Sequence, residues 1–249
     1  MHKLTTRAAL MAAAFCLAGS SIAVAQTQAT QTQATQTPTK YWFDLNGGAQ
    51  TQSESIEMTN SFPLYGETAI INTAQGVDGG GLFDISAGYR INAQFGVSLG
   101  VSIFTDNGES SVAASIPSPV VINRPANVTA TKTDLKHKEV GTSVLLSYFR
   151  PITDKIEAVL SIGPVFYNVS QDFTTSSVPT GTQSLSLGST RERARTAGVN
   201  IGANINYFVR PNYGAGVFLR YAGGNADFDS FDDLRVGGVQ LGIGARLRF

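Results

Sequence analysis

The sequence predicts an all-β protein: an eight-stranded antiparallel transmembrane β-barrel with short periplasmic turns and long extracellular loops. Three observations predict it. Apolar residues recur at every second position in eight segments, each about the 9–11 residues that a tilted membrane strand needs. Long and short connections alternate between these segments, as they do in outer-membrane barrels. Aromatic residues gather at one end of the predicted strands, where lipid meets water.

The predicted strand nearest the C-terminus, residues 239–249, shows the alternation best. Every odd position is apolar, and every even position is Gly, Gln or Arg. A soluble sheet also alternates, but its polar face meets water and rarely holds so many glycines. Small residues on one face therefore indicate the interior of a narrow tube. The other seven predicted strands lie near residues 41–50, 82–91, 95–104, 139–149, 156–167, 196–207 and 213–222.

The connections between these strands give an independent test of the barrel. The predicted short links are 92–94, 151–155 and 208–212. The predicted long links are roughly 51–81, 105–138, 168–195 and 223–235. Four long and three short links place both ends of the barrel on the periplasmic side.

Eight outward-facing aromatic residues fall at the predicted periplasmic ends of the strands. They are Tyr41, Phe43, Tyr89, Phe95, Tyr148, Tyr207, Tyr213 and Phe249. The core of a soluble β-sandwich, the main alternative, gives no reason for such rings to share one level, whereas a membrane interface does. Because backbone groups in lipid must pair internally, the sheet is expected to close.

The first 25 residues are predicted to be a cleaved secretory signal peptide. Lys3 and Arg7 precede an apolar run, and Ala23-Val24-Ala25 forms a small-residue cleavage motif. Residues 26–39 are a Gln/Thr-rich repeat, which we interpret as a flexible leader before the barrel at residues 40–249. Cys16, the only cysteine, lies in the signal segment, so the mature chain carries no thiol chemistry.

Composition excludes other classes. Lys and Arg total 18 against 18 Asp and Glu, so the chain lacks the basic excess of a nucleic-acid-binding protein, and no nucleic-acid partner is expected. Hydrophobic residues make up 42%, which is too many for a disordered chain. Charged residues make up only 14%, well below the roughly 25% of an ordinary soluble domain, as expected if one face of each strand lies in lipid.

The chain resembles the small bacterial outer-membrane β-barrel proteins, in the broad OmpA/OmpX-like or OmpW-like sense. The resemblance covers about residues 40–249 and is carried by Tyr41-Trp42-Phe43-Asp44, by the segment 83–90, by Gly163-Pro164-Val165-Phe166 and by the C-terminal segment. It implies the outer membrane of a Gram-negative envelope, contact with outer-membrane lipid, and recognition by the barrel-insertion machinery. Gly244, Leu247 and Phe249 match the terminal assembly signal of such proteins, whereas Gly242 stands where a polar residue is typical.

Eight charged residues are predicted to face the lumen: Asp44, Asp84, Arg90, Glu139, Glu157, Arg220, Arg246 and Arg248. We interpret them as ion pairs that satisfy one another in an interior just wide enough for side chains. Because the last strand must meet the first, Asp44 and Arg246 are expected to be neighbours. The alternative is a narrow channel for small or hydrophobic solutes, as in OmpW-like proteins, with Pro164 marking either a weak point in the wall or a bulge.

The outer rim is predicted to be basic, where anionic lipopolysaccharide headgroups would lie. Its residues are Lys132, Lys136, His137, Lys138, Arg191, Arg193 and Arg195. His137 is interpreted as a solvated surface residue, so a lipid-modifying enzyme that pairs it with a serine such as Ser143 is the less favoured reading. We expect no catalytic residue, no cofactor and no metal; the acidic loop with Asp227, Asp229, Asp232 and Asp233 lacks the spacing of a calcium loop.

Two predicted external loops are more apolar than loops need to be. They contain Phe62-Pro63-Leu64-Tyr65 and residues 116–122. Such residues either extend the barrel above the membrane, which is the favoured interpretation, or bind a surface partner or a hydrophobic small molecule. The sequence therefore predicts a non-enzymatic barrel with a structural or surface-interaction role.

Overall fold

The computed structural model describes residues 39–52 and 54–249. The predicted signal peptide, and the predicted leader apart from Thr39, lie outside the described residues. None of the described residues forms a helix long and apolar enough to cross a membrane.

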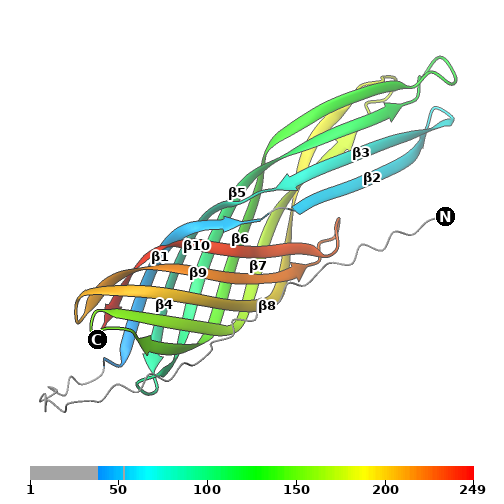
Figure 1. Ribbon diagram of the computed structural model, residues 1–249. Helices are drawn as coiled ribbons and strands as arrows, with labels where there is room; N and C mark the ends of the chain where they lie inside the picture. Colours follow the sequence, from blue (N-terminus) through cyan, green and yellow to red (C-terminus); the bar gives the residue numbers. More distant parts are fainter. Residues whose placement is uncertain (1–38, 53) are drawn as a thin grey trace, which may run out of the picture. The chain divides into compact units, whose positions relative to one another are not determined.

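Ten β-strands make up the described part of the chain. Their bounds are β1 Tyr41–Thr51, β2 Glu54–Leu64, β3 Glu67–Val77, β4 Gly80–Arg90, β5 Phe95–Ile116, β6 Ala126–Pro151, β7 Ile156–Ser177, β8 Ser186–Arg210, β9 Tyr213–Ala226 and β10 Leu234–Arg248. Eight of them close into an antiparallel ring in the order β1-β4-β5-β6-β7-β8-β9-β10, and β10 pairs with β1 from Trp42↔Arg248 to Thr51↔Val239 (Figure 1). The predicted eight-stranded barrel is confirmed.

Short links join β4 to β5, β6 to β7 and β8 to β9 at one end of the ring, which we call the turn end; the C-terminus lies there (Figure 1). The opposite end, called the loop end, carries the longer connections. There the prediction of a loop at 51–81 was wrong, because β2 and β3 form a hairpin in this segment. Its turn, Tyr65-Gly66, has positive φ at both residues (52° and 82°), the backbone of a tight two-residue hairpin turn.

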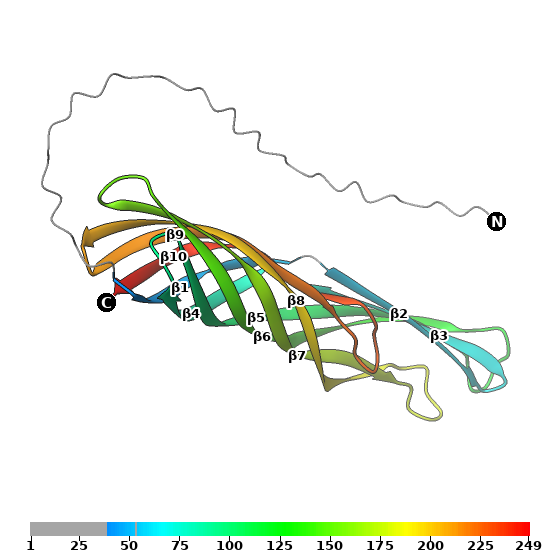
Figure 2. The same ribbon diagram turned by 90° about the horizontal axis from the view of Figure 1, so that it is seen from below.

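Strands β5 to β8 run well past the predicted boundaries and build an extension at the loop end. β3 of the hairpin pairs with the far part of β5, from Ile70↔Ser115 to Gln75↔Ser110. β5 also pairs with β6 up to Ile116↔Ala126, and β7 pairs with β8 up to Ser177↔Ser186. Figure 2 shows the hairpin and the ends of these four strands continuing beyond β1, β4, β9 and β10.

The extension has an apolar interior of its own. Ile71, Val112, Ala114 and Ile116 are buried there and pack against Phe62, Leu64, Val128, Val178, Leu185 and Leu187. Phe62, Leu64 and Ile116 thus extend the barrel, as expected, whereas Val120, Val121 and Ile122 lie exposed in the connection between β5 and β6. A bulge in β6 changes which of its side chains point toward this core. The pairing shifts from Gly108↔Leu135 to Ser110↔Lys132, and Asp134 in the bulge has a φ of 61°.

The outer wall of the ring is apolar between two aromatic levels. The eight predicted turn-end rings all lie on the outside, and Tyr41 stacks near Tyr89 with centroids 5.4 Å apart. A second level at the loop end, which the sequence reading did not identify, holds Phe83, Phe166 and Tyr221, each 48–52% exposed. Leu and Ile side chains 37–71% exposed fill the band between them. Such a wall is stable against lipid and not against water.

Pro164 interrupts the ladder between β6 and β7 without a bulge. The pairs Ser143↔Val165 and Leu146↔Ile162 keep the same register, and the two pairs between them are missing. Proline has no N–H to donate, so the gap falls where the ladder loses a donor. On the other side Pro164 still pairs with Val199. The bulge interpretation is therefore wrong, and the weak point in the wall stays a prediction that the two missing pairs favour.

Candidate functional site

The interior of the ring is organised in layers, and the layer at the turn end is a charged cluster. Arg246 makes a two-pronged ion pair with Asp44, at 2.5 Å from Nε and 2.6 Å from Nη2. Arg90 donates to both oxygens of Glu157 at 2.7 and 2.8 Å. Arg248 and Arg246 reach the same glutamate at 3.4 and 3.8 Å. All five side chains are at most 15% exposed, so three guanidinium groups share two carboxylates largely out of water, and the layer keeps one positive charge in excess.

Aromatic rings fill the space between these charges. Trp42 and Phe149 are buried and meet edge to face, with centroids 5.0 Å apart. The guanidinium of Arg90 lies 3.9 Å from the centre of the Phe149 ring, a cation–π arrangement. Gly88 makes room for the indole, because a Cβ there would lie 2.1 Å from Cζ2 of Trp42. The turn end of the lumen is therefore closed by packed side chains.

The middle layer is polar and nearly full. Asp84 accepts a hydrogen bond of 2.6 Å from Asn46 Nδ2 and forms an ion pair of 3.3 Å with Arg220, which also donates to Gln240. The cavity at this level is only about 30 Å³ in volume. Serines, asparagines and charged residues line most of it, together with Trp42, Leu145 and Val159. That volume is room for about one water molecule.

Glu139 and His137 build the next layer, and here one prediction was wrong. His137 is 2% exposed and points into the barrel; its Nε2 lies 2.9 Å from Glu139 and its Nδ1 contacts Gln171. The lysines on either side of it point outward because side chains alternate along a strand. The parity that placed Glu139 inside also placed His137 inside, and the basic neighbours obscured that signal.

The carboxylate of Glu139 is held by further donors rather than by an arginine. Gln50 donates at 3.0 Å, and the backbone N–H of Gly237 donates to both carboxylate oxygens at 3.0 Å. Gly237 has a φ of +77°, and a Cβ there would lie 1.9 Å from the carbonyl oxygen of Ala222. Glycine is thus required at this position. Sequence reasoning grouped Glu139 with the lumen charges but did not identify its amide partners.

An apolar plug covers these polar layers toward the loop end. Phe173 and Phe228 lie edge to face at 5.4 Å, and the segment between β9 and β10 carries Phe228 into the interior. The buried residues of the plug are Ile56, Val77, Val165, Tyr167, Val169, Phe173, Ala194, Ala226, Phe228, Leu234 and Val236. The lumen is therefore occupied by side chains from one end to the other.

No family profile matches the chain, and no curated protein matches it. Several solved structures are similar in arrangement. The N-terminal β-barrel domain of Pseudomonas aeruginosa OprF is 15% identical, with 85% of this chain and 98% of that chain covered and a TM-score of 0.42. The outer membrane protein OprG of Pseudomonas aeruginosa is 10% identical, with 85% of this chain and 97% of that chain covered and a TM-score of 0.46. Neisserial surface protein A is 18% identical, with 84% of this chain and 96% of that chain covered and a TM-score of 0.42.

The assignment to a membrane rests on the closed ring and its apolar wall, not on these similarities. The chain is an eight-stranded β-barrel of the outer-membrane type. Its predicted assembly residues lie on β10, the strand that seals the barrel, or directly after it. Leu247 and Phe249 face outward at 42% and 63% exposure, and Phe249 exchanges two backbone hydrogen bonds with Tyr41 at 2.9 and 3.1 Å. Gly244 faces inward against Asn46.

The outer wall of the barrel carries a basic patch at the loop end, on the neighbouring strands β6, β7 and β8. Residues paired across neighbouring strands form rows around the barrel. The row Thr142–Phe166–Ala197 is the last one of the loop-end aromatic level on these strands. Above it, successive outward rows contain Arg195, then Lys138 and Arg193, then Lys136 and Arg191. We call these five residues the basic wall. Lys132 lies farther out on β6, beyond the bulge.

Asp172 ties the uppermost row of the basic wall together. Arg191 donates to it at 2.6 and 2.9 Å, and the backbone N–H of Lys136 donates at 3.3 Å. The hydrogen bonds from Arg191 hold the pKa of Asp172 below its usual value, and the bond from Lys136 acts in the same direction. This carboxylate joins β6, β7 and β8 just where the ladder between β6 and β7 ends, at His137↔Gln171.

Proposed function

We propose that the barrel is a non-enzymatic surface-interaction protein of the outer membrane, and that the basic wall holds it against the phosphates of lipopolysaccharide. The observation that carries the proposal is the loop-end extension. β5 to β8 are 22 to 26 residues long, at least twice the 9–11 residues needed to cross the membrane. The excess length builds a separately packed structure outside the lipid.

The basic wall supports the lipid partner. It begins one row above Phe166, at the level where the anionic headgroups of the outer leaflet meet a barrel. Its side chains point outward, so they are available to lipid and not to the lumen. Guanidinium groups bind phosphate oxygens in a two-pronged manner, which favours Arg193 and Arg195 on β8 for this contact, since Arg191 already makes a two-pronged pair with Asp172.

The lipid part of the proposal is tested by the urea unfolding of the protein from vesicles with and without lipopolysaccharide. We expect lipopolysaccharide to stabilise the wild type and to lose most of this effect in Lys138→Gln/Arg193→Gln/Arg195→Gln. The matched control is Lys40→Gln/Lys155→Gln/Arg210→Gln, which removes three exposed basic residues at the turn end. Equal losses in both variants would contradict specific headgroup binding.

The second candidate function is a narrow channel with a lateral opening, and the interrupted ladder at Pro164 favours it. Against it stands the small central cavity of about 30 Å³, which leaves no continuous path. Planar-bilayer recordings separate the two functions. We expect no discrete conductance from the wild type or from Arg246→Ala; steps in the wild type that Arg246→Ala alters would establish the channel.

A further inference from the structure

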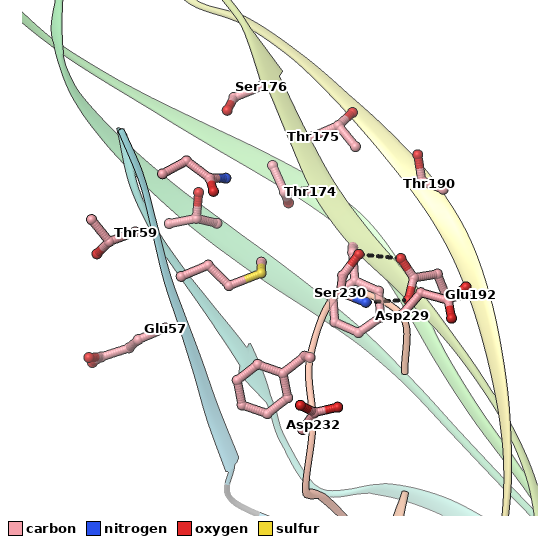
Figure 3. A pocket seen from close by; sticks show the side chains of 15 residues that line it. Glu57, Thr59, Thr174, Thr175, Ser176, Thr190, Glu192, Asp229, Ser230 and Asp232 are labelled. Atoms are coloured by element: carbon pink, nitrogen blue, oxygen red, sulfur yellow. Dashed lines mark hydrogen bonds between the residues drawn. The ribbon is translucent and has the colours of Figure 1, made fainter. Parts of the chain in front are cut away.

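The sheet of the extension is not closed: the ladder between β6 and β7 ends at His137↔Gln171, and β2 and β8 do not pair with each other. β2 pairs only with β3, and residues 186–197 of β8 pair only with β7, because β9 pairs with β8 from Gly198 onward. A cleft of about 720 Å³ lies between these two unpaired edges and is closed at its base by the segment that joins β9 to β10 (Figure 3).

The lining of this cleft is strongly acidic. Glu57 comes from β2, Glu192 from β8, and Asp229 and Asp232 from the β9–β10 segment (Figure 3). No Lys or Arg is among the residues that line it, and most of the other polar groups are hydroxyls. Glu192 is used locally, since it accepts from the N–H of Ser230 at 3.1 Å. The other three carboxylates make no side-chain ion pair within the described part of the chain, and Glu57 lies exposed on the outer side of β2 at the rim of the cleft (Figure 3).

A second observation, independent of the acidic residues, also points to a ligand. The Thr174 side chain lines the cleft and is only 8% exposed, yet among the described residues its Oγ1 has no hydrogen-bond partner. Its backbone N–H is satisfied by Gln75 at 3.4 Å, so the hydroxyl alone lacks a partner. Buried hydroxyls are normally paired, and rotation of the Thr174 side chain would let a polar ligand in the cleft provide the missing bond.

The free edge of β2 indicates the form of that ligand. Leu64 and Glu67 flank the two-residue turn and exchange both backbone hydrogen bonds, so the even residues of β2 bond to β3 and the odd ones direct their N–H and C=O groups to the free side. Pro63, which has no N–H, falls on the free side as this pattern requires. Glu57 and Thr59 also belong to it, and both line the cleft.

We propose that the cleft binds an extended basic peptide segment of another protein, which adds to β2 as a further strand and places Lys or Arg side chains against Glu57, Asp229 and Asp232. This proposal rests on the surface-interaction role proposed above, and it specifies a basic peptide segment as the partner in that role. Main-chain pairing gives the affinity in such strand addition, and the side-chain charges give the selectivity. A second copy of this chain fits less well, because pairing two β2 edges would bring the Glu57 carboxylates of both copies together.

The test uses the full-length barrel in lipid nanodiscs and a fluorescent peptide of alternating lysine and threonine, with binding followed by anisotropy. We expect saturable binding that weakens as salt is raised. An alternating glutamate–threonine peptide should not bind. The lysine peptide with N-methyl groups on alternate residues keeps its charge and loses its strand donors, so its affinity should fall about tenfold or more.

Two variant pairs locate the site. Glu57→Gln/Asp232→Asn should weaken binding of the lysine peptide about tenfold, whereas Glu109→Gln/Asp154→Asn, with the same change of charge at exposed positions elsewhere, should not. Thr59→Pro and Thr59→Val both lose the hydroxyl, but only Thr59→Pro loses an N–H on the free edge. Binding should therefore fall in Thr59→Pro relative to Thr59→Val, and the N-methylated peptide tests the same bond without any change to the protein.

Three outcomes would overturn the proposal: no binding of the lysine peptide, equal binding of the glutamate peptide, or equal losses in the cleft variant and its charge-matched control. Concentration-dependent dimerisation of the wild type without peptide binding would assign the edge to a second copy instead and would also overturn it. None of these results depends on lipopolysaccharide or on conductance. Failure of the peptide site is thus distinguishable from failure of the proposed function.

Discussion

The lumen within the lipid band and the core of the loop-end extension are built from continuous strands, yet their interiors have opposite polarity. The lumen buries Asp44, Glu157 and Arg246 with their partners. The extension buries Ile71 and Ile116. The backbone pairing is the same in both, so the surroundings of the wall account for the difference.

β5 shows the inversion within a single strand. Its outward residues are apolar from Phe95 to Ile103 and polar or small from Thr105 to Ala113. Its inward residues change in the opposite sense, from Gly96 and Ser98 to Val112 and other apolar residues. In lipid the outer face must be apolar and the narrow interior takes small and polar groups, whereas in water the interior must supply the apolar burial. The inversion marks the membrane boundary along the strand.

The two interiors should therefore respond differently to substitution, and the largest effect is expected in the lumen. Asp44→Ala leaves Arg246 buried without its main partner, which should lower the free energy of unfolding by about 3–5 kcal/mol. Urea unfolding from lipid vesicles, followed by the fluorescence of Trp42, the only tryptophan, measures it. Asp44→Leu/Arg246→Met should recover most of the loss; a double variant as unstable as Asp44→Ala would contradict the ion-pair account.

The extension should lose stability locally when its apolar core is cut. Ile116→Ala removes a fully buried side chain, at a cost of about 2–4 kcal/mol. Because the ring below does not depend on this residue, proteolysis should increase at the β5–β6 and β7–β8 tips. On SDS gels we expect the unboiled variant, like the unboiled wild type, to migrate faster than the boiled protein, because the ring stays folded. Loss of that migration would show that ring and extension unfold as one unit.

Two glycines, Gly88 facing the lumen and Gly47 on the outer wall, allow the tightness of side-chain packing at the two places to be compared. Gly88→Ala places a methyl group 2.1 Å from the Trp42 ring and should destabilise the barrel by about 1–3 kcal/mol with a shift in indole emission. The control is Gly47→Ala, since a Cβ at this position meets nothing within 4 Å. Equal stability of the two variants would mean that the indole does not occupy the space above Gly88.

The smallest effect is expected at low pH, where the uppermost row of the basic wall should lose stability locally. The pKa of Asp172 is lowered in the folded protein, so its bonds to Arg191 and Lys136 contribute stability above the ordinary aspartate pKa and are lost as the pH falls below about 4. Hydrogen exchange of the β7 and β8 amides near Asp172 should quicken in that range. Asp172→Asn should abolish the pH dependence there, and an unchanged profile would contradict the role of this carboxylate.

The sequence predicted the part of the fold in which one face of each strand is apolar. All eight ring strands and the juxtaposition of Asp44 with Arg246 follow from the period-two alternation and from closure of the ring. The predicted boundaries near 104, 139, 167 and 196 fall short of the observed ends because the alternation changes face there. The β2–β3 hairpin was missed for the same reason: its exposed face is polar and its buried face is short.

The layers inside the barrel were predictable only in part. Parity assigns the charged residues and His137 to the interior, but it does not pair them, because partners on different strands are fixed by register and shear. Arg90 and Glu157 lie on β4 and β7, far apart in sequence and not neighbours in the ring, and meet across the lumen. The acidic cleft depends in the same way on segments from β2, β8 and the β9–β10 connection.

The inversion of polarity along β5 is tested most directly by a single-cysteine spin-label scan of residues 95–113 in lipid vesicles, which is simplified because Cys16 is the only native cysteine. At the odd positions we predict contact with membrane-soluble oxygen from Phe95 to Ile103, and contact with a water-soluble nickel reagent from Thr105 onward. At the even positions both reagents should be excluded. Oxygen contact continuing through Ala113, or nickel contact at the even positions below Phe104, would contradict the account of a filled lumen and an extension outside the membrane.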